Sequence, residues 1–168
     1  FGKKRIAPGE FVNIKIDGLF LRRPISVCDY SENKITLIYK VVGEGTEIMS
    51  KMSCGDTLDI LVGLGNGFDH TVDTKKPVLI GGGVGVPPLY NLCKKLIEGG
   101  KTVSVILGFN TKDEIFYKKE FENLGVKTFV ATADGSYGIK GFVTDALKDI
   151  EYDYFFTCGP MPMFRAIE

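Results

Sequence analysis

The stretch Val78-Leu79-Ile80-Gly81-Gly82-Gly83-Val84-Gly85-Val86-Pro87-Pro88 decides the fold class of this chain. Its first three residues form a continuous apolar run, which is typical of a strand buried on both faces. Glycines follow at once, and the two prolines suit the first turn of a helix, where a missing N–H does no harm. Glycines between a buried strand and a helix let the backbone approach a pyrophosphate at the helix N-terminus. The stretch therefore predicts a phosphate-binding turn.

This turn departs from the GxGxxG fingerprint, because Pro88 stands where the third glycine would be. A tight strand-to-helix turn without any ligand is the alternative interpretation. Four glycines in the five residues 81–85 exceed what such a turn requires, since each glycine costs conformational entropy on folding. This favours the binding turn.

The residues that follow alternate between helix and strand patterns. Apolar residues at 89, 92, 93, 96 and 97 lie on one helix face, which Gly99-Gly100 would end. Strands are predicted at 78–80, 103–107, 126–131 and 154–157, and helices near 118–123, 142–148 and from 161 onward. Alternation of this kind predicts right-handed βαβ units with a parallel sheet.

A second glycine segment, Thr157-Cys158-Gly159-Pro160-Met161, also follows a buried strand and precedes a helix. Ligands of open α/β sheets bind beyond the carboxyl ends of the strands. The loops after Ile80 and Thr157 are therefore expected to face one dinucleotide. Taken alone, a cysteine such as Cys158 is more often a buried apolar filler than a functional thiol.

The first part of the chain has the period of two that marks half-buried strands. Alternating apolar residues occur at 12–16, 35–41 and 58–62, separated by turn signals at 17–18, 31–33 and 54–56. Short antiparallel strands at this spacing predict a small barrel or sandwich. The pattern changes near residues 70–76, so we expect one domain at 1–72 and a second at 73–168.

Composition excludes several classes of function. Lys+Arg and Asp+Glu both total 21, which gives no net field to attract nucleic acid or an acidic membrane. No apolar run is long enough to span a membrane. The four cysteines, at 28, 54, 93 and 158, have no CxxC spacing, so no metal site is expected in this chain. Free thiols indicate a reducing, cytoplasmic location. The first residues lack an initiator Met and a signal-peptide pattern, which predicts an internal start.

Flavin-binding candidates lie in the first domain. Arg23 could hold a phosphate and Ser26 could donate to a flavin ring. Tyr39 could stack on a flat ring, while Gly45 and Thr46 could offer backbone amides to a phosphate. A solvated arginine, a barrel tyrosine and a hairpin turn are the respective alternatives.

Together the segments 23–26 (RPIS), 43–46 (GEGT), 82–88 (GGVGVPP) and 158–160 (CGP) resemble the ferredoxin-reductase superfamily, in which an FAD barrel precedes an NAD(P) domain. One branch fits best. The segments 22–26, 39–46, 64–68 (LGNGF) and 158–163 (CGPMPM) look like the electron-transfer subunits of class 1B dihydroorotate dehydrogenases. The resemblance spans about residues 8–168.

This resemblance implies the site residues. FAD would contact Arg23, Pro24, Ile25, Ser26, Ile38, Tyr39, Lys40, Gly45 and Thr46. NAD would contact Gly82, Gly83, Gly85, Pro88, Asp134, Cys158, Gly159 and Pro160. Cys158 would lie near the nicotinamide and flavin N5. NAD(H) is expected over NADP(H), because Asp134 would repel a 2′-phosphate and no arginine lies beside it.

The resemblance also implies partners. An FMN-containing catalytic subunit, joined with this one in a heterotetramer, would oxidise dihydroorotate in pyrimidine biosynthesis. The electrons would pass through a [2Fe–2S] cluster to FAD and then, as hydride, to NAD⁺. In that family the cluster lies in a cysteine-rich tail, so a longer subunit is expected. A first strand before Phe1 would be missing, leaving the barrel incomplete, and Val62-Gly63 replace the family's Gly-Pro. The alternatives are a flavin reductase subunit serving ferredoxin or a hydrogenase, and a non-catalytic nucleotide sensor.

Overall fold

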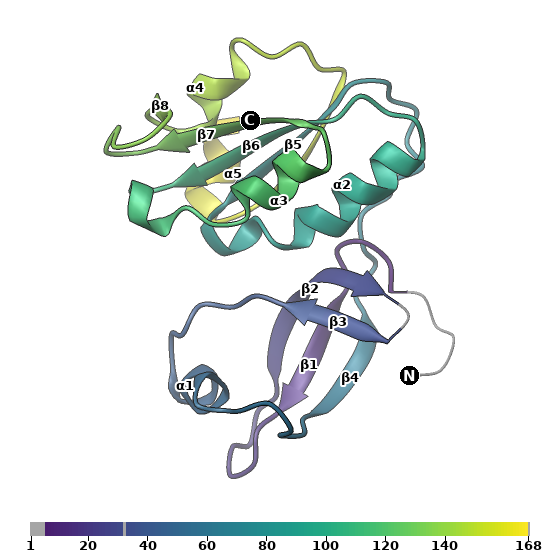
Figure 1. The fold of residues 1–168 in the computed structure, drawn as a ribbon, viewed down its shortest axis with the longest axis vertical. Coiled ribbons are helices and arrows are strands. Elements are labelled where there is room, and N and C mark those ends of the chain that lie inside the picture. Colours follow the sequence, from purple (N-terminus) through teal and green to yellow (C-terminus); the bar gives the residue numbers. More distant parts are fainter. Residues whose placement is uncertain (1–5, 32, 168) are drawn as a thin grey trace.

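A computed structural model describes residues 6–31 and 33–167 (Figure 1). Within this part of the chain the strands form two sheets, one antiparallel and one parallel. The two predicted fold halves are therefore both present. The expectations that concern residues 1–5, Glu32 and Glu168 lie outside the described residues.

The antiparallel sheet has the strand order β3-β2-β1-β4. Its strands are β1 (Phe11–Lys15), β2 (Arg23–Ser31), β3 (Lys34–Leu37) and β4 (Asp59–Leu64). Alternation sets its core: Val12 and Ile14 are fully buried, while Lys15 is exposed. Ile25 and Val27 of β2 complete the buried layer together with Met49. The period-two prediction is confirmed for β1, β3 and β4, whereas β2 was not among the predicted strands.

Two elements in this half differ from what the sequence analysis considered. Residues 23–26 lie inside β2, where no strand was expected. Residues 44–50 form a short helix, α1 (Glu44–Ser50), so the alternative of a hairpin turn at Gly45 and Thr46 is wrong. The helix forms in place of a turn because Met49 then buries its side chain against the antiparallel sheet. Strand β3 ends at Leu37, so it is shorter than the alternation at residues 35–41 predicted.

The parallel sheet has the strand order β8-β7-β6-β5-β9. Its strands are β5 (Pro77–Gly82), β6 (Ser104–Phe109), β7 (Lys127–Thr132), β8 (Ile139–Lys140) and β9 (Tyr154–Cys158). The connecting helices are α2 (Pro88–Glu98), α3 (Lys118–Asn123), α4 (Val143–Leu147) and α5 (Met161–Ile167), with 3₁₀ turns at Gly83–Gly85 and Lys112–Glu114. Strand β8 carries no alternating pattern, which is why the sequence analysis missed it.

Helices cover both faces of the parallel sheet. Leu79, Val105 and Phe156 face a core that also contains α2 and Phe121 of α3. Val78, Ile80 and Ile106 face the opposite core, which α4 and α5 cover. Residues 78–80 are fully buried, as a strand covered on both faces requires. No helix in the described residues is long and apolar enough to cross a membrane.

The order of the strands places the switch point of the sheet between β5 and β9. From β5 the chain moves to β6, β7 and β8 on one side, and then crosses to β9 on the other. Loops on the two sides of such a point diverge and leave a crevice at the carboxyl ends of the strands. The two glycine segments follow β5 and β9, so both lie at this crevice.

Candidate cofactor-binding site

The two glycine segments touch each other directly. Strands β5 and β9 pair in parallel, with Ile80 beside Thr157 and Gly81 beside Cys158. A Cβ atom added at Gly85 would lie 2.1 Å from the carbonyl oxygen of Cys158 and 2.7 Å from the nitrogen of Gly159. The expectation that one edge presents both loops is confirmed by this contact.

Three further glycines, Gly82, Gly83 and Gly159, line the crevice with bare backbone. Gly83 has φ +52°, and no atom lies within 4 Å of its hypothetical Cβ. A Cβ at Gly82 would lie 2.8 Å from the Met163 sulfur, and one at Gly159 would lie 2.5 Å from the Met163 Cε. Met163 thus packs against the backbone at both positions, and neither has room for a side chain. The space beside Gly83 is open, which makes it the candidate position for a pyrophosphate.

The thiol of Cys158 lies at the end of β9 and is partly buried. Burial raises its pKa above the ordinary value, so the thiol is protonated near neutral pH. The sulfur packs against the core formed with α2. A protonated thiol suits a positioning group better than a nucleophile.

Asp134 follows β7 at the same sheet edge, two strands away from β5. Its carboxylate accepts hydrogen bonds from the Ser136 N–H (2.9 Å) and the Ser136 hydroxyl (2.6 Å). These bonds lower the Asp134 pKa, so the exposed side chain is charged at neutral pH. The structure thus places Asp134 where a ligand reaching across β6 would meet a fixed negative charge.

The loop after β6 contributes residues that the sequence analysis missed. The backbone N–H and the side-chain amide of Asn110 donate to Glu114, at 3.0 and 2.9 Å. The Asp134 N–H donates to the Asn110 carbonyl (3.1 Å), so this loop lies between β5 and Asp134. The order of the strands is the signal that could have found it, because a strand beside the switch point always contributes its carboxyl-end loop.

In the antiparallel half, Arg23 and Gly45 are in close contact, as Gly85 and Cys158 are in the parallel half. A Cβ at Gly45 would lie 2.3 Å from the Arg23 Nε, so the guanidinium lies directly over this glycine. Arg23 also donates to the carbonyl of Leu21. A guanidinium held over glycine backbone is a suitable partner for a phosphate. These two predicted residues are brought together.

The side chain of Thr46 has a structural role that was not predicted. Its hydroxyl accepts from the N–H groups of Val42 (3.0 Å) and Gly43 (3.2 Å) and donates to the Gly43 carbonyl (2.8 Å). The side chain therefore fixes the segment that enters α1. Through this bonding it holds the backbone beside Arg23 in place.

The remaining flavin candidates occupy β2 and the segment after β3. Ser26 is half-buried and pairs with Phe11 of β1. Ile25 points into the core, so a cofactor on this strand would meet its backbone. Tyr39 packs against the same core, while Ile38 is half-buried and Lys40 and Pro24 are exposed. Tyr39 also lines a cavity of about 260 Å³ together with Met49 and Met52.

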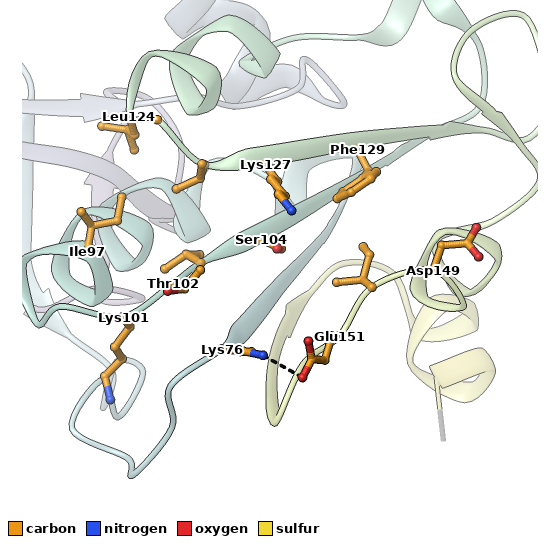
Figure 2. A pocket seen from close by; sticks show the side chains of 14 residues that line it. Lys76, Ile97, Lys101, Thr102, Ser104, Leu124, Lys127, Phe129, Asp149 and Glu151 are labelled. Atoms are coloured by element: carbon orange, nitrogen blue, oxygen red, sulfur yellow. Dashed lines mark ion pairs between the residues drawn. The ribbon is translucent and has the colours of Figure 1, made fainter.

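A larger cavity, of about 450 Å³, lies at the opposite edge of the parallel sheet (Figure 2). It is lined at the amino ends of β5, β6 and β7 by Lys76, Ser104 and Lys127. Lys76 forms an ion pair with Glu151 (2.7 Å). Helices α2 and α3 end here, and lysines complement the negative ends of helix dipoles. The cavity therefore lies at the amino ends of the strands, at the opposite edge of the sheet from the glycine loops.

Among the described residues, no group of three or more His, Cys, Asp or Glu side chains is arranged to hold a metal ion. The four cysteines are all free, and two of them, Cys28 and Cys93, are buried.

Comparisons with known proteins agree with the geometry. A family profile described as an oxidoreductase NAD-binding domain matches residues 79–168. The dihydroorotate dehydrogenase B (NAD(+)) electron transfer subunit of Fusobacterium nucleatum subsp. nucleatum is 47% identical over 180 residues, which cover 99% of this chain and 69% of that protein. The subunit of the same name from Geobacillus sp. strain WCH70 is 46% identical over 171 residues, or 96% of this chain and 66% of that protein.

Among solved structures, the NADH-dependent reduced ferredoxin-NADP oxidoreductase from work on flavin-based electron bifurcation matches with a TM-score of 0.83. It is 34% identical, and the match covers 95% of this chain and 59% of that one. The chain thus spans about two thirds of the length of its curated relatives and less of this structural neighbour. The identity extends over both sheets and both glycine segments, so the chain belongs to the family of dihydroorotate dehydrogenase B (NAD(+)) electron-transfer subunits, within the oxidoreductases.

Proposed function

We propose that the chain binds FAD along β2 and residues 38–46, binds NAD(H) between the β5 and β9 loops, and passes electrons between the two cofactors. The observation that supports this most is the contact of Gly85 with the backbone of Cys158, which joins both glycine loops at the switch point. The division into an FAD-binding domain at 1–72 and an NAD-binding domain at 73–168 is part of this proposal.

The residues of the chain position the cofactors. Arg23 would hold the FAD pyrophosphate over Gly45, and the amide-bearing turn at Gly82–Gly85 would hold that of NAD. Pro88 begins α2, whose N-terminal end adds a positive potential beside the NAD phosphates. Gly159 and Pro160 would support the nicotinamide, with the neutral Cys158 thiol beside it. When bound, FAD supplies the redox chemistry by exchanging a hydride with NAD(H).

Hydride exchange requires no protein acid or base, and the described edge of the sheet fits that requirement. Two of its charged groups, Asp134 and Glu114, are engaged by Ser136 and Asn110 respectively. They bind and orient, and their negative charge favours NAD(H) over NADP(H).

We propose further that the full subunit works with an FMN-containing catalytic subunit that oxidises dihydroorotate, in a cytoplasmic heterotetramer. The names of the curated relatives support this assignment. The relatives are longer than this chain, and a [2Fe–2S] cluster held by a cysteine-rich tail would carry the electrons between the subunits. Within residues 6–31 and 33–167 no cluster site exists, so this step requires the longer subunit.

A reconstitution experiment tests the proposal. The chain is mixed with FAD, passed through gel filtration and examined for flavin absorbance near ~450 nm. We expect retained flavin that NADH bleaches under anaerobic conditions. Dihydroorotate should cause no bleaching until the longer subunit and the catalytic partner are added. A colourless chain, or flavin that NADH leaves oxidised, would contradict the proposed function.

A further inference from the structure

We infer that Asp29 and Lys94 form an ion pair that fixes the orientation of the antiparallel sheet relative to the parallel sheet, and so positions the nicotinamide for the flavin. The effect on the nicotinamide rests on the proposed function, whereas the ion pair itself is a contact within the chain. The Lys94 Nζ lies 2.7 Å from the Asp29 carboxylate oxygen, with side-chain exposures of 31% and 29%.

The two elements joined by this pair are those that carry the cofactor segments. Strand β2 begins with Arg23 and reaches Asp29 after the predicted flavin residues. Helix α2 begins directly after the glycine turn and carries Lys94 on its second turn. Figure 1 shows α2 on the side of its sheet that faces β2. A displacement at this contact would therefore shift the glycine turn relative to the flavin segment.

A buried contact beside the ion pair strengthens the link. Cys28, the neighbour of Asp29 in β2, is fully buried, and its thiol lies close enough to the Tyr117 hydroxyl to influence its pKa. Tyr117 immediately precedes α3 and has φ +62°, a backbone conformation that tyrosine rarely adopts. Its ring packs edge-on against Tyr90 of α2, at 5.1 Å between centroids. Such an outlier persists where surrounding contacts hold it, and here those contacts join the two sheets.

Lys94 also lies over the aromatic ring of Tyr90, with its Nζ 5.9 Å from the ring centroid. The ammonium is thus held by a carboxylate from β2 and an aromatic face from its own helix. A partly desolvated pair with two partners has a defined geometry, unlike the solvated Lys95–Glu98 pair on the same helix. This difference makes Lys95 a matched control.

Phe68 provides a second point of attachment between the sheets. Its N–H donates to the Pro8 carbonyl (2.7 Å), which precedes β1. Its ring packs edge-on against Phe156 of β9, at 6.0 Å between centroids. Two separated contacts fix the orientation of one sheet relative to the other, whereas with Phe68 alone the sheets could rotate about that single contact. The contact between β2 and α2, of which the Asp29–Lys94 pair is the charged member, is therefore the one that sets the angle.

The first test uses the cofactor-free chain and measures residual dipolar couplings of backbone amides in both sheets. In the wild-type chain and in Lys95→Met, one alignment tensor should fit both sheets. In Asp29→Asn and Lys94→Met, the two sheets should require tensors of different magnitude. The exchange variant, Asp29→Lys with Lys94→Asp, should return to one tensor. A single tensor in both single variants would overturn the inference, whatever cofactors the chain binds.

The second test measures anaerobic flavin reduction by NADH in the reconstituted chain. Asp29→Asn and Lys94→Met should lower the limiting rate about tenfold, because small misplacements of reacting groups are costly. The NADH concentration for half-saturation should change by less than about twofold, since each binding segment is intact. Tyr117→Phe should act in the same direction.

Rates that fall in the single variants without recovery in the exchange variant would overturn the positioning role. A wild-type flavin that NADH does not reduce contradicts the proposed function instead, and the coupling measurement then decides the inference alone.

Discussion

A Cβ atom on Gly85 would lie 2.1 Å from the carbonyl oxygen of Cys158, so only a hydrogen at residue 85 lets the two loops of the crevice touch. The clash would be with backbone, which cannot rotate away as a flexible side chain can. This contact ties the turn after β5 to the loop after β9, and both loops would hold the same dinucleotide.

Gly85→Ala should therefore separate the loops and weaken NADH binding by more than about tenfold, with a loss of ~1–3 kcal/mol in the free energy of unfolding. Isothermal titration with NADH and urea denaturation measure the two effects. Gly99→Ala is the control, because a Cβ there meets its nearest atom at an ordinary 3.4 Å. Unchanged NADH affinity in Gly85→Ala would show that the loop contact is irrelevant to binding.

Arg23→Ala should release FAD, because a charge-assisted contact to a phosphate contributes about 1.5–3 kcal/mol. Gly45→Ala should act in the same direction, since its Cβ would lie 2.3 Å from the Arg23 Nε and displace the guanidinium. The flavin retained after gel filtration measures both. Arg22→Ala provides an arginine control, because Arg22 is paired with Asp59 instead. Full occupancy in Arg23→Ala would refute the pyrophosphate assignment.

NADH should reduce the flavin at lower concentrations than NADPH does. Asp134 is charged at neutral pH, since hydrogen bonds from Ser136 lower its pKa, and a 2′-phosphate near it would be repelled. Asp134→Asn should narrow the difference between the two nucleotides chiefly by improving NADPH binding. Comparison of half-saturating concentrations at low and high salt measures this, because the repulsion is screened. A wild-type preference for NADPH would contradict the prediction.

The sequence predicted the parallel half of the fold best, for a physical reason. Residues 78–80 are apolar on both faces, and the helix at 89–97 has an apolar stripe, so local pattern and tertiary burial coincide. In the antiparallel half, glycines 43 and 45 favour a turn locally. Helix α1 forms nevertheless, because Met49 buries its side chain and the Thr46 hydroxyl fixes the entry to the helix.

The candidate site was predictable to a similar degree. Glycine segments have a distinctive composition, so residues 82–85 and 158–160 could be singled out as candidates, and their contact followed from the rule on strand ends. Asn110 and Glu114 were missed because an Asn-to-Glu hydrogen bond has no sequence signature. The contact between Asp29 and Lys94 joins residues 65 positions apart, and no local pattern reports such a pairing.

Asp153 should make the chain sensitive to acid. Its carboxylate accepts from the buried Thr74 hydroxyl and from the N–H groups of Lys75 (2.7 Å) and Lys76 (3.0 Å). These bonds hold the Asp153 pKa below its ordinary value of about 3.9. The contribution to stability is therefore complete above that value and is lost as pH falls through the lower folded pKa.

Asp153→Asn should accordingly lower the Tm at pH 7, and its difference from wild type should shrink below about pH 4. Thermal unfolding followed by circular dichroism between these pH values measures the effect. Asp113→Asn, on the exposed turn after β6, is the control. A difference that is constant across this range would show that ionisation of Asp153 plays no part.

The four thiols should react in an order set by burial, and NAD⁺ should change only one of them. Cys54 is exposed and should react first with a chromogenic disulfide reagent at pH 8. Burial raises the pKa of Cys28 to about 11 and that of Cys93 to about 12. Only the thiolate attacks, and about one thiol in a thousand or fewer is ionised at such pKa values, so these two should react only on unfolding.

Cys158 lies between these extremes, because its pKa is raised but its side chain is only partly buried. It should react slowly in the free chain, and saturating NAD⁺ should slow it at least about tenfold by covering the loop after β9, since reagent access limits the reaction. Mass mapping of labelled peptides separates Cys158 from Cys54, and Cys54→Ser should remove the fast phase alone. Equal protection of Cys54, which lies in the turn before β4, would indicate a global effect of NAD⁺. Labelling of Cys158 that NAD⁺ leaves unchanged would place the nucleotide elsewhere and contradict the assignment of the crevice between β5 and β9.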